Sequence, residues 1–168
     1  MKKRLWFSVI VLFIVFLFIG VFSAGYLSRE HSIPPATAQA PSNIKVYDLW
    51  VGANKERTSR GVPALSLNPQ LNKSASDKCA HMAKYDYWAH TAPDGTEPWV
   101  FFKKYLARAE ATGENLAYGQ DTHKKVIDGW MQSEGHKKNL LNSGFTNVGY
   151  AVCDFRGTKL TVQHLVRI

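Results

Sequence analysis

Cysteine is scarce in this chain, with two residues among 168. Two cysteines form one bridge at most, so a miniprotein held together by several disulfides is excluded. Internal repeats and low-complexity tracts are also lacking after the first 42 residues, and 45% of all residues are apolar, too many for a wholly disordered protein. Length and composition therefore predict one ordinary globular domain.

A dense basic stripe is missing as well, although the formal net charge is +8 at pH 7. Lys2, Lys3 and Arg4 supply three of these charges, and other basic residues are spread along the chain in pairs such as Lys103–Lys104. Proteins that bind nucleic acids more often gather their basic residues on one face or along one helix. We therefore expect no nucleic-acid partner.

One long apolar run stands at the N-terminus. No charged residue occurs between Leu5 and Ser28, and Leu5–Phe22 consists almost entirely of Leu, Ile, Val and Phe. About 20 apolar residues span a bilayer as a helix, and the basic flank in residues 1–4 favours a cytoplasmic N-terminus. We expect residues 5–26 to form an uncleaved transmembrane signal anchor, with the rest of a single-pass membrane protein outside the cell.

A secreted protein is the alternative. Ala38-Gln39-Ala40 has the small-x-small pattern of a signal-peptide cleavage site, but the apolar run is longer than the usual core of a signal peptide. Residues 27–42 are rich in Pro and Ala, have no periodic apolar positions and predict an extended linker. The folded extracellular domain is therefore expected at residues 43–168.

Apolar spacing within this domain predicts helices first and a hairpin last. The first expected helix runs from a cap at Ser42 or Asn43 to Gly61, and the second begins at Pro69 with Cys79 on its apolar face. A short helix is expected over Pro98–Arg108, followed by a helix that is capped by Thr122 and includes Met131. The last element is a hairpin that turns at Arg156-Gly157. Both hairpin strands have apolar side chains on both faces, as in a sheet covered on each side. The fold class is α+β, with helices on a mainly antiparallel sheet.

Polar residues suited to chemistry gather between Ala89 and Asn142, without a His-Glu-x-x-His pair or a Gly-x-Ser-x-Gly elbow. The candidates are two imidazoles and one carboxylate, those of His90, His136 and Glu114. They either supply three ligands of a zinc site with one position open or form a hydrogen-bonded cluster in which the carboxylate orients the imidazoles. Ser133 precedes His136 by helical spacing, but no orienting third group makes them a nucleophile and base.

Several short motifs follow one another in a characteristic order. Asn54-x-x-Arg57 and Gly61-Val62-Pro63-Ala64-Leu65 are followed by His90, Gly113-Glu114-Asn115-Leu116, Trp130-x-x-Ser133-x-x-His136-x-x-Asn139 and Asn147-Val148-Gly149. This order closely resembles bacterial members of the CAP superfamily (cysteine-rich secretory proteins, antigen 5 proteins and pathogenesis-related proteins), whose domain is also called the SCP domain. The resemblance covers residues 43–168 and implies an α-β-α sandwich.

The resemblance also implies a cavity lined by two histidines and acidic residues. These positions correspond to His90, His136 and Glu114, which would bind a divalent metal such as zinc. Animal members have a further acidic residue where this chain has Ser133, as bacterial members commonly do, and the neighbouring Glu134 is an additional candidate. Residues 163–165 are Gln-His-Leu where relatives commonly have an acidic residue and an aromatic, so the resemblance assigns no cavity residue to the last strand.

Several of these residues also have purely structural interpretations. Glu114 and Asn115 can bond backbone groups in a loop that has no secondary structure of its own. Trp88, Trp99 and Trp130 are expected in the core, because aromatic side chains dominate core burial.

The two cysteines leave two possibilities open. Cys79 and Cys153 form a disulfide between the second helix and the sheet, as an extracytoplasmic location permits. Alternatively, both are small apolar side chains that remain free thiols.

Two functions from different classes remain open. The first is a non-enzymatic binding module, tethered through residues 5–26, that takes an unknown small-molecule, lipid or protein ligand. The second is a metal-assisted hydrolase of peptide or cell-wall substrates, with Glu114 as base toward a metal-bound water. The lack of a dedicated nucleophile and of a tight metal motif favours the binding module.

Overall fold

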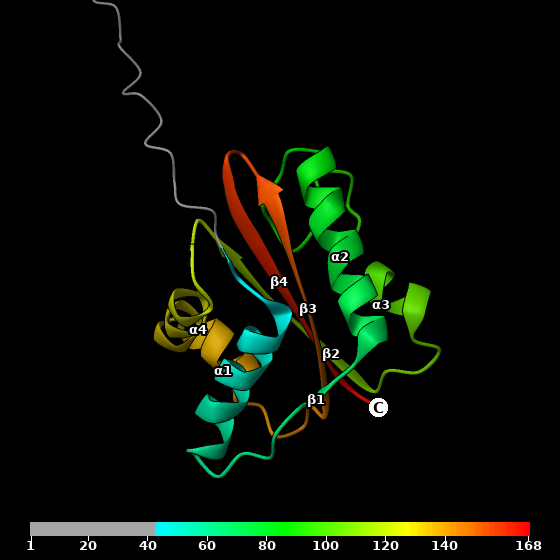
Figure 1. Ribbon diagram of the computed structural model, residues 1–168. Helices are drawn as coiled ribbons and strands as arrows, with labels where there is room; N and C mark the ends of the chain where they lie inside the picture. Colours follow the sequence, from blue (N-terminus) through cyan, green and yellow to red (C-terminus); the bar gives the residue numbers. More distant parts are fainter. Residues whose placement is uncertain (1–42) are drawn as a thin grey trace, which may run out of the picture. The chain divides into compact units, whose positions relative to one another are not determined.

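The computed structural model describes residues 43–168 (Figure 1). The described residues form helices α1 (Val46–Thr58), α2 (Pro69–Lys84), α3 (Trp99–Tyr105), α4 (His123–Gln132) and α5 (Glu134–Leu140), and strands β1 (Ser66–Leu67), β2 (Ala111–Tyr118), β3 (Asn147–Phe155) and β4 (Thr158–Arg167). The predicted anchor (residues 5–26) and linker (27–42) lie outside the described part. Within 43–168, none of the helices has the length and apolarity needed to cross a membrane.

The four strands form one sheet in the order β1-β3-β4-β2. The hairpin strands β3 and β4 are antiparallel, and β2 pairs antiparallel with β4 and so forms one edge of the sheet. The short strand β1 pairs parallel with β3 at the other edge. The sheet is therefore mixed, and the expectation of a mainly antiparallel sheet missed the parallel strand, which is only two residues long.

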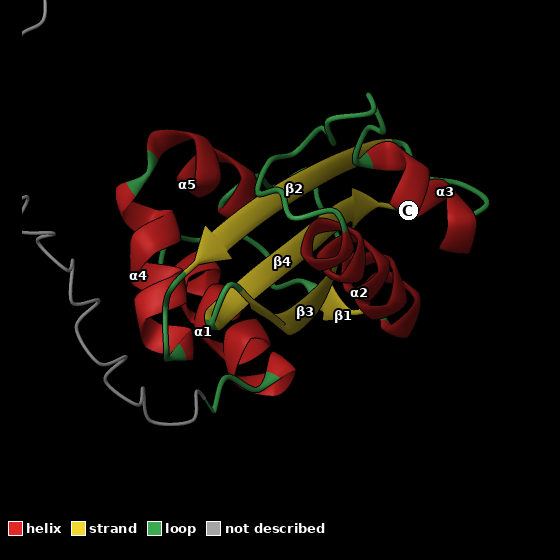
Figure 2. Cartoon of the chain, turned by 90° about the horizontal axis from the view of Figure 1, so that it is seen from above, coloured by secondary structure: helices red, strands yellow, loops and turns green. Residues whose placement is uncertain are grey.

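Helices cover both faces of the sheet (Figure 2). One layer contains α2 and α3, and the other contains α1, α4 and α5. Alternate residues of β4 pack against the two helical layers. Leu160 and Val162 pack in the core beneath α2, whereas Leu165 packs with Trp130 of α4 in the opposite core. The prediction of a hairpin with apolar residues on both faces is confirmed, as are the α+β class and the layered architecture.

Local signals set the starts of two helices, α2 and α4. The side chain of Asn68 accepts a hydrogen bond from the Gln70 backbone N–H at the start of α2, and Pro69 occupies the first turn, where its missing N–H costs nothing. Thr122 caps α4 in the same way. The first helix differs from the prediction, because it begins at Val46 with Lys45 at the N-cap position rather than Ser42 or Asn43.

Two further predictions are wrong. Glu114 and Asn115 do not lie in a loop but within β2, where their backbone groups pair with β4. Trp88 and Trp99 are not core residues, since they are 50% and 48% exposed. Trp130 is buried as predicted.

The first motif of the sequence resemblance has a structural role. Arg57 is fully buried, and its guanidinium donates to the carbonyl oxygens of Pro63 (2.8 Å), Leu140 (2.8 Å), Asn142 (2.9 Å) and Phe145 (3.3 Å). Asn54 exchanges two hydrogen bonds with the backbone of Leu65. These side chains tie α1 to the segment before β1 and to the end of α5 and the loop after it, so the motif specifies the scaffold rather than a binding site.

The described residues contain the elements that stabilise the fold. They include three apolar clusters, the sheet and the disulfide Cys79–Cys153, whose Cα atoms are 6.2 Å apart. The disulfide joins α2 to β3, the two elements that the sequence pattern places at these cysteines.

Candidate functional site

A buried carboxylate at the sheet edge is the centre of the site. Glu114 of β2 and His164 of β4 are directly opposite one another in the register, so their side chains project from the same face toward α2. Glu114 Oε2 lies 3.0 Å from His164 Nε2, and Glu114 Oε1 lies 2.6 Å from His90 Nδ1. Both carboxylate oxygens are therefore bonded to imidazoles, and Glu114 is 7% exposed.

These contacts determine which ring nitrogens carry protons. A carboxylate only accepts, so His164 donates from Nε2 and His90 donates from Nδ1. The Nδ1 of His164 then accepts from the hydroxyl of Ser74 at 2.9 Å. Neutral His90 has its lone pair on Nε2, on a side chain that is 54% exposed, so this nitrogen is available to a ligand.

The pKa values agree with a charged Glu114 carboxylate beside a neutral His164 imidazole. Burial alone would raise the pKa of Glu114, but hydrogen bonds from His164 and His90 and the positive charge of Lys78 bring it below its usual value. Burial lowers the pKa of His164, and Glu114 opposes this only in part. His164 is also stacked on Phe102, with the ring centroids 4.1 Å apart, so its position is tightly constrained.

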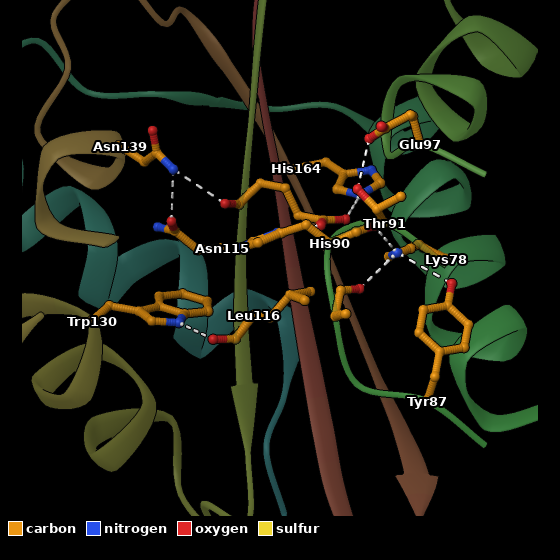
Figure 3. Close-up of polar contacts among 12 residues, drawn as sticks. Lys78, Tyr87, His90, Thr91, Glu97, Asn115, Leu116, Trp130, Asn139 and His164 are labelled. Carbon is orange, nitrogen blue, oxygen red and sulfur yellow. Dashed lines mark hydrogen bonds and ion pairs between the residues drawn. The ribbon is translucent and has the colours of Figure 1, made fainter. Parts of the chain in front are cut away.

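A buried lysine holds the loop that presents His90. Lys78 of α2 is fully buried, and its ammonium group donates to the hydroxyl of Tyr87 (3.2 Å), the carbonyl of Ala89 (3.0 Å) and the carbonyl of His90 (Figure 3). Its ammonium lies 5.0 Å from the centroid of the Tyr87 ring. Because an ammonium group has three N–H donors, these three acceptors use its full capacity.

The opposite face of β2 anchors α5. The Asn115 amide donates to the carbonyl of His136 (3.1 Å) and to Gln163 Oε1 (2.8 Å). The Asn139 amide donates to Asn115 Oδ1 (3.0 Å) and to the carbonyl of Glu114 (3.1 Å), as Figure 3 shows for the two asparagines. A structural role was considered for both Glu114 and Asn115. Asn115 has one, whereas Glu114 bonds imidazoles.

His136 approaches the same sheet edge from the other helical layer. Its side chain is half-buried, and burial together with the nearby His90 lowers its pKa, which favours the neutral imidazole. His136 and Ser133 line a cleft of about 220 Å³ between β2 and α4, whereas His90 and Glu114 do not. Glu134 begins α5, is exposed and does not line this cleft.

The three-ligand metal set is not preassembled. Among residues 43–168, no three His, Cys, Asp or Glu side chains converge in an arrangement that could hold a metal ion. Glu114, expected as a ligand, instead directs both oxygens to imidazoles. Its role in this arrangement is to orient His90.

Two residues of the site were missed by the sequence analysis. His164 was set aside because the last strand departs from the pattern of relatives, yet it bonds Glu114 directly. The alternation that places Leu160 and Val162 on one face also places His164 there, and this was the available signal. Lys78 had no such signal, because a lysine on a helix is usually solvated.

Known proteins are similar to this chain in sequence and in fold. Residues 53–165 match the family described as CAP, cysteine-rich secretory protein family. The uncharacterized protein YkwD of Bacillus subtilis (strain 168) is 37% identical over 115 residues, 67% of this chain and 45% of YkwD. The uncharacterized membrane protein YlbC of the same organism is 27% identical over 114 residues, 68% of this chain and 32% of YlbC.

A solved structure also places this chain among proteins with a SCP domain. An extracellular protein containing a SCP domain from Bacillus anthracis superposes with a TM-score of 0.68 at 27% identity, over 73% of this chain and 40% of that one. The matched region is less than half the length of each of these three proteins. The matched residues 53–165 include Glu114 and its contacts His90 and His164, together with Lys78. The chain belongs to the CAP (cysteine-rich secretory protein) family.

Proposed function

We propose that the chain is a membrane-tethered, extracytoplasmic binding module in which His90 and His136 hold a divalent metal such as zinc. The observation that supports this most directly is the bond from His90 Nδ1 to Glu114 Oε1, at 2.6 Å. A carboxylate that accepts from one ring nitrogen fixes the imidazole with its other nitrogen free, which is how metal-binding histidines are commonly oriented.

The chemistry of the two histidines fits such an ion. Metal binding requires neutral imidazoles, and the pKa of His136 is already below its usual value through burial and proximity to His90. Two imidazoles occupy two positions of a tetrahedral zinc site, which leaves positions for a ligand or water. Bound metal would supply a Lewis acid at the exposed edge of the domain, and the affinity should be modest because only two residues of the chain contribute.

The contacts of Glu114 favour binding over hydrolysis. A catalytic base must reach the attacking water, but Glu114 is buried and each of its oxygens already accepts from an imidazole. Ser74, His164 and Glu114 are linked in series, but Ser74 is fully buried and has no access to a substrate. These contacts are the reason for proposing a binding module rather than a metal-assisted hydrolase.

Calorimetric titration with zinc tests the metal proposal. Residues 43–168 should bind zinc at pH 7.5 and much more weakly at pH 5.5, because imidazoles protonate near pH 6.5. His90→Ala and His136→Ala should each weaken binding strongly, whereas His123→Ala on α4 is the matched control and should bind like the wild type. Equal binding by the wild type and the double variant would overturn the proposal.

The tether is proposed from the apolar run Leu5–Phe22 and the basic residues before it. Protease added to intact cells should remove the domain and leave the anchor in the membrane. Recovery of the protein in the medium with an N-terminus at Pro41 would instead establish a cleaved signal.

A further inference from the structure

Helix α3 and the loop after it enclose an apolar groove. The groove has a volume of about 280 Å³, and its lining includes Trp99, Phe102 and Leu106. Trp99 and the next residue, Val100, are 48% and 50% exposed. In the part of the chain that the structure describes, no other two consecutive residues are both large, apolar and this exposed. This end of the domain therefore presents apolar area that contact with a partner would remove from water.

The charges beside this groove are all positive. Residues 98–109 contain Lys103, Lys104 and Arg108 and no acidic residue. Lys104 pairs with Asp77 of α2 at 2.5 Å, whereas Lys103 and Arg108 are exposed and have no carboxylate partner among the described residues. Lys103 also lines the groove, so its aliphatic stem can cover apolar area while its ammonium group stays in water. Apolar and cationic groups therefore share one surface.

This surface has a rigid base. Phe102 is 2% exposed and stacks on His164 of β4, with the ring centroids 4.1 Å apart. The hydroxyl of Tyr105 donates to Asp77 Oδ2 on α2 at 2.8 Å. Helix α3 is thus fixed to both the sheet and its neighbouring helix, and it lies at the opposite end of the domain from α4 (Figures 1 and 2).

We propose that the α3 surface, formed by Trp99, Val100, Lys103 and Arg108, docks the domain on a lipid bilayer that contains anionic lipids. Indole rings prefer the headgroup region of a bilayer, and exposed Lys and Arg are attracted by anionic headgroups. Two exposed apolar side chains are too few for a stable interface with a second copy, which takes roughly 20–30 residues on each side.

The proposed anchor makes a weak contact of this kind sufficient. The linker, residues 27–42, spans about 50 Å when fully extended. A folded domain of 126 residues is roughly 35 Å across, with a radius of gyration of about 14 Å. Each face of the domain is therefore within reach of the bilayer, at an effective concentration that the tether raises. The chemistry of the surface, rather than the tether, then selects the face that docks.

Vesicle cosedimentation tests the α3 surface without the anchor. Residues 43–168 are mixed, in the presence of a chelator, with vesicles of phosphatidylcholine alone or with about one third phosphatidylglycerol. We expect binding to the anionic vesicles and roughly tenfold weaker binding to phosphatidylcholine alone, because the basic side chains lose their attraction. Added salt should weaken binding to the anionic vesicles.

A matched pair of double variants separates this surface from net charge. Val100→Glu/Lys103→Glu should lower the affinity for anionic vesicles by about tenfold or more. Val51→Glu/Lys55→Glu replaces the same residue types at exposed positions of α1 and changes the net charge equally, and it should lose no more than about twofold. Equal losses in the two double variants would overturn the proposal, because binding would then follow net charge alone.

Brominated lipids identify the tryptophan that contacts the bilayer. Bromine on the acyl chains quenches the fluorescence of an indole that enters the headgroup region. Quenching should be lost in Trp99→Phe and kept in Trp88→Phe, whose tryptophan is equally exposed but lies outside the α3 surface. Quenching that persists in Trp99→Phe would contradict the proposal.

Two further outcomes would overturn it. One is the absence of binding to anionic vesicles, and the other is a dimer of residues 43–168 that Val100→Glu/Lys103→Glu dissociates, since a second copy would then cover the surface. Neither metal nor the anchor is present in these experiments, so their results are independent of the zinc titration and of the protease test.

Discussion

At the scale of single residues, the buried imidazole of His164 makes stability depend on pH. Burial lowers its pKa below the ordinary value of 6.5, so the unfolded chain takes up a proton at a higher pH than the folded chain does. The stabilising contribution of neutral His164 is therefore complete above pH 6.5 and declines as the pH falls below it. Glu114, whose pKa is also lowered, adds a second decline below 4.5.

Replacing His164 with Gln tests this effect. His164→Gln removes the titrating group, so the variant should be less stable than the wild type at pH 7.5, and the gap in melting temperature should narrow at pH 5.0. Thermal unfolding at both pH values measures the gap. His123→Gln, at the start of α4, is the control and should follow the wild type. A gap for His164→Gln that stays constant between the two pH values would contradict the account.

At this scale, the sequence revealed the site residues that stand in short motifs but not those whose role depends on burial. His90 and Glu114 were identified from short motifs, and the structure brings them within hydrogen-bond distance. Their partners His164 and Lys78 escaped notice, because neither residue type indicates burial by itself and each becomes buried only through tertiary packing.

At the scale of elements, the tight contact between α2 and β3 depends on Gly149. A Cβ at this position would overlap the backbone of Leu71 and Asn72 on α2. The Asn72 side chain also accepts a hydrogen bond from the Tyr150 backbone N–H at 2.8 Å, which holds the helix at this distance. Helix and strand have no flexible side chain between them that could move aside.

Gly149→Ala should therefore destabilise the domain by about 3 kcal/mol, the upper part of the usual range for overpacking. Urea unfolding of residues 43–168 measures the change. Gly129→Ala is the matched control: its Cβ meets nothing within 4 Å and it lies inside α4, so alanine should be neutral or stabilising by about 0.5 kcal/mol. Equal stability of Gly149→Ala and the wild type would refute the close contact.

Elements with local signals were predicted, and those without them were not. Pro69 and the cap Thr122 marked the starts of α2 and α4 correctly, because both signals act on neighbours in sequence. Glu114 and Asn115 were expected in a loop, since they are polar and the strand β4 that pairs with them follows more than forty residues later in the chain. The same absence of a local signal hid the parallel strand β1.

At the scale of the whole molecule, the disulfide links α2 to the hairpin across 74 residues of sequence. Cys79 is buried against the sheet, so the bridge crosses the interior of one layer. Closing a loop of this length lowers the entropy of the unfolded chain and stabilises the fold by about 4 kcal/mol in the chain-entropy model.

Reduction should therefore lower the melting temperature markedly, and the Cys79→Ser/Cys153→Ser double variant should resemble the reduced protein. Thiol titration in denaturant without reductant provides the control and should detect no free thiol. Two free thiols per chain would show that the cysteines are only apolar side chains of the core.

The central claim is that Glu114 fixes His90 with Nδ1 protonated and Nε2 free at the surface. Long-range ¹H–¹⁵N NMR of the imidazoles of metal-free residues 43–168 at pH 7.5 tests it directly, because protonated and unprotonated ring nitrogens have well-separated ¹⁵N shifts. The account predicts a proton on Nδ1 of His90 and on Nε2 of His164, with the His90 preference lost in Glu114→Gln. A His90 ring protonated on Nε2, with Nδ1 free, would contradict it.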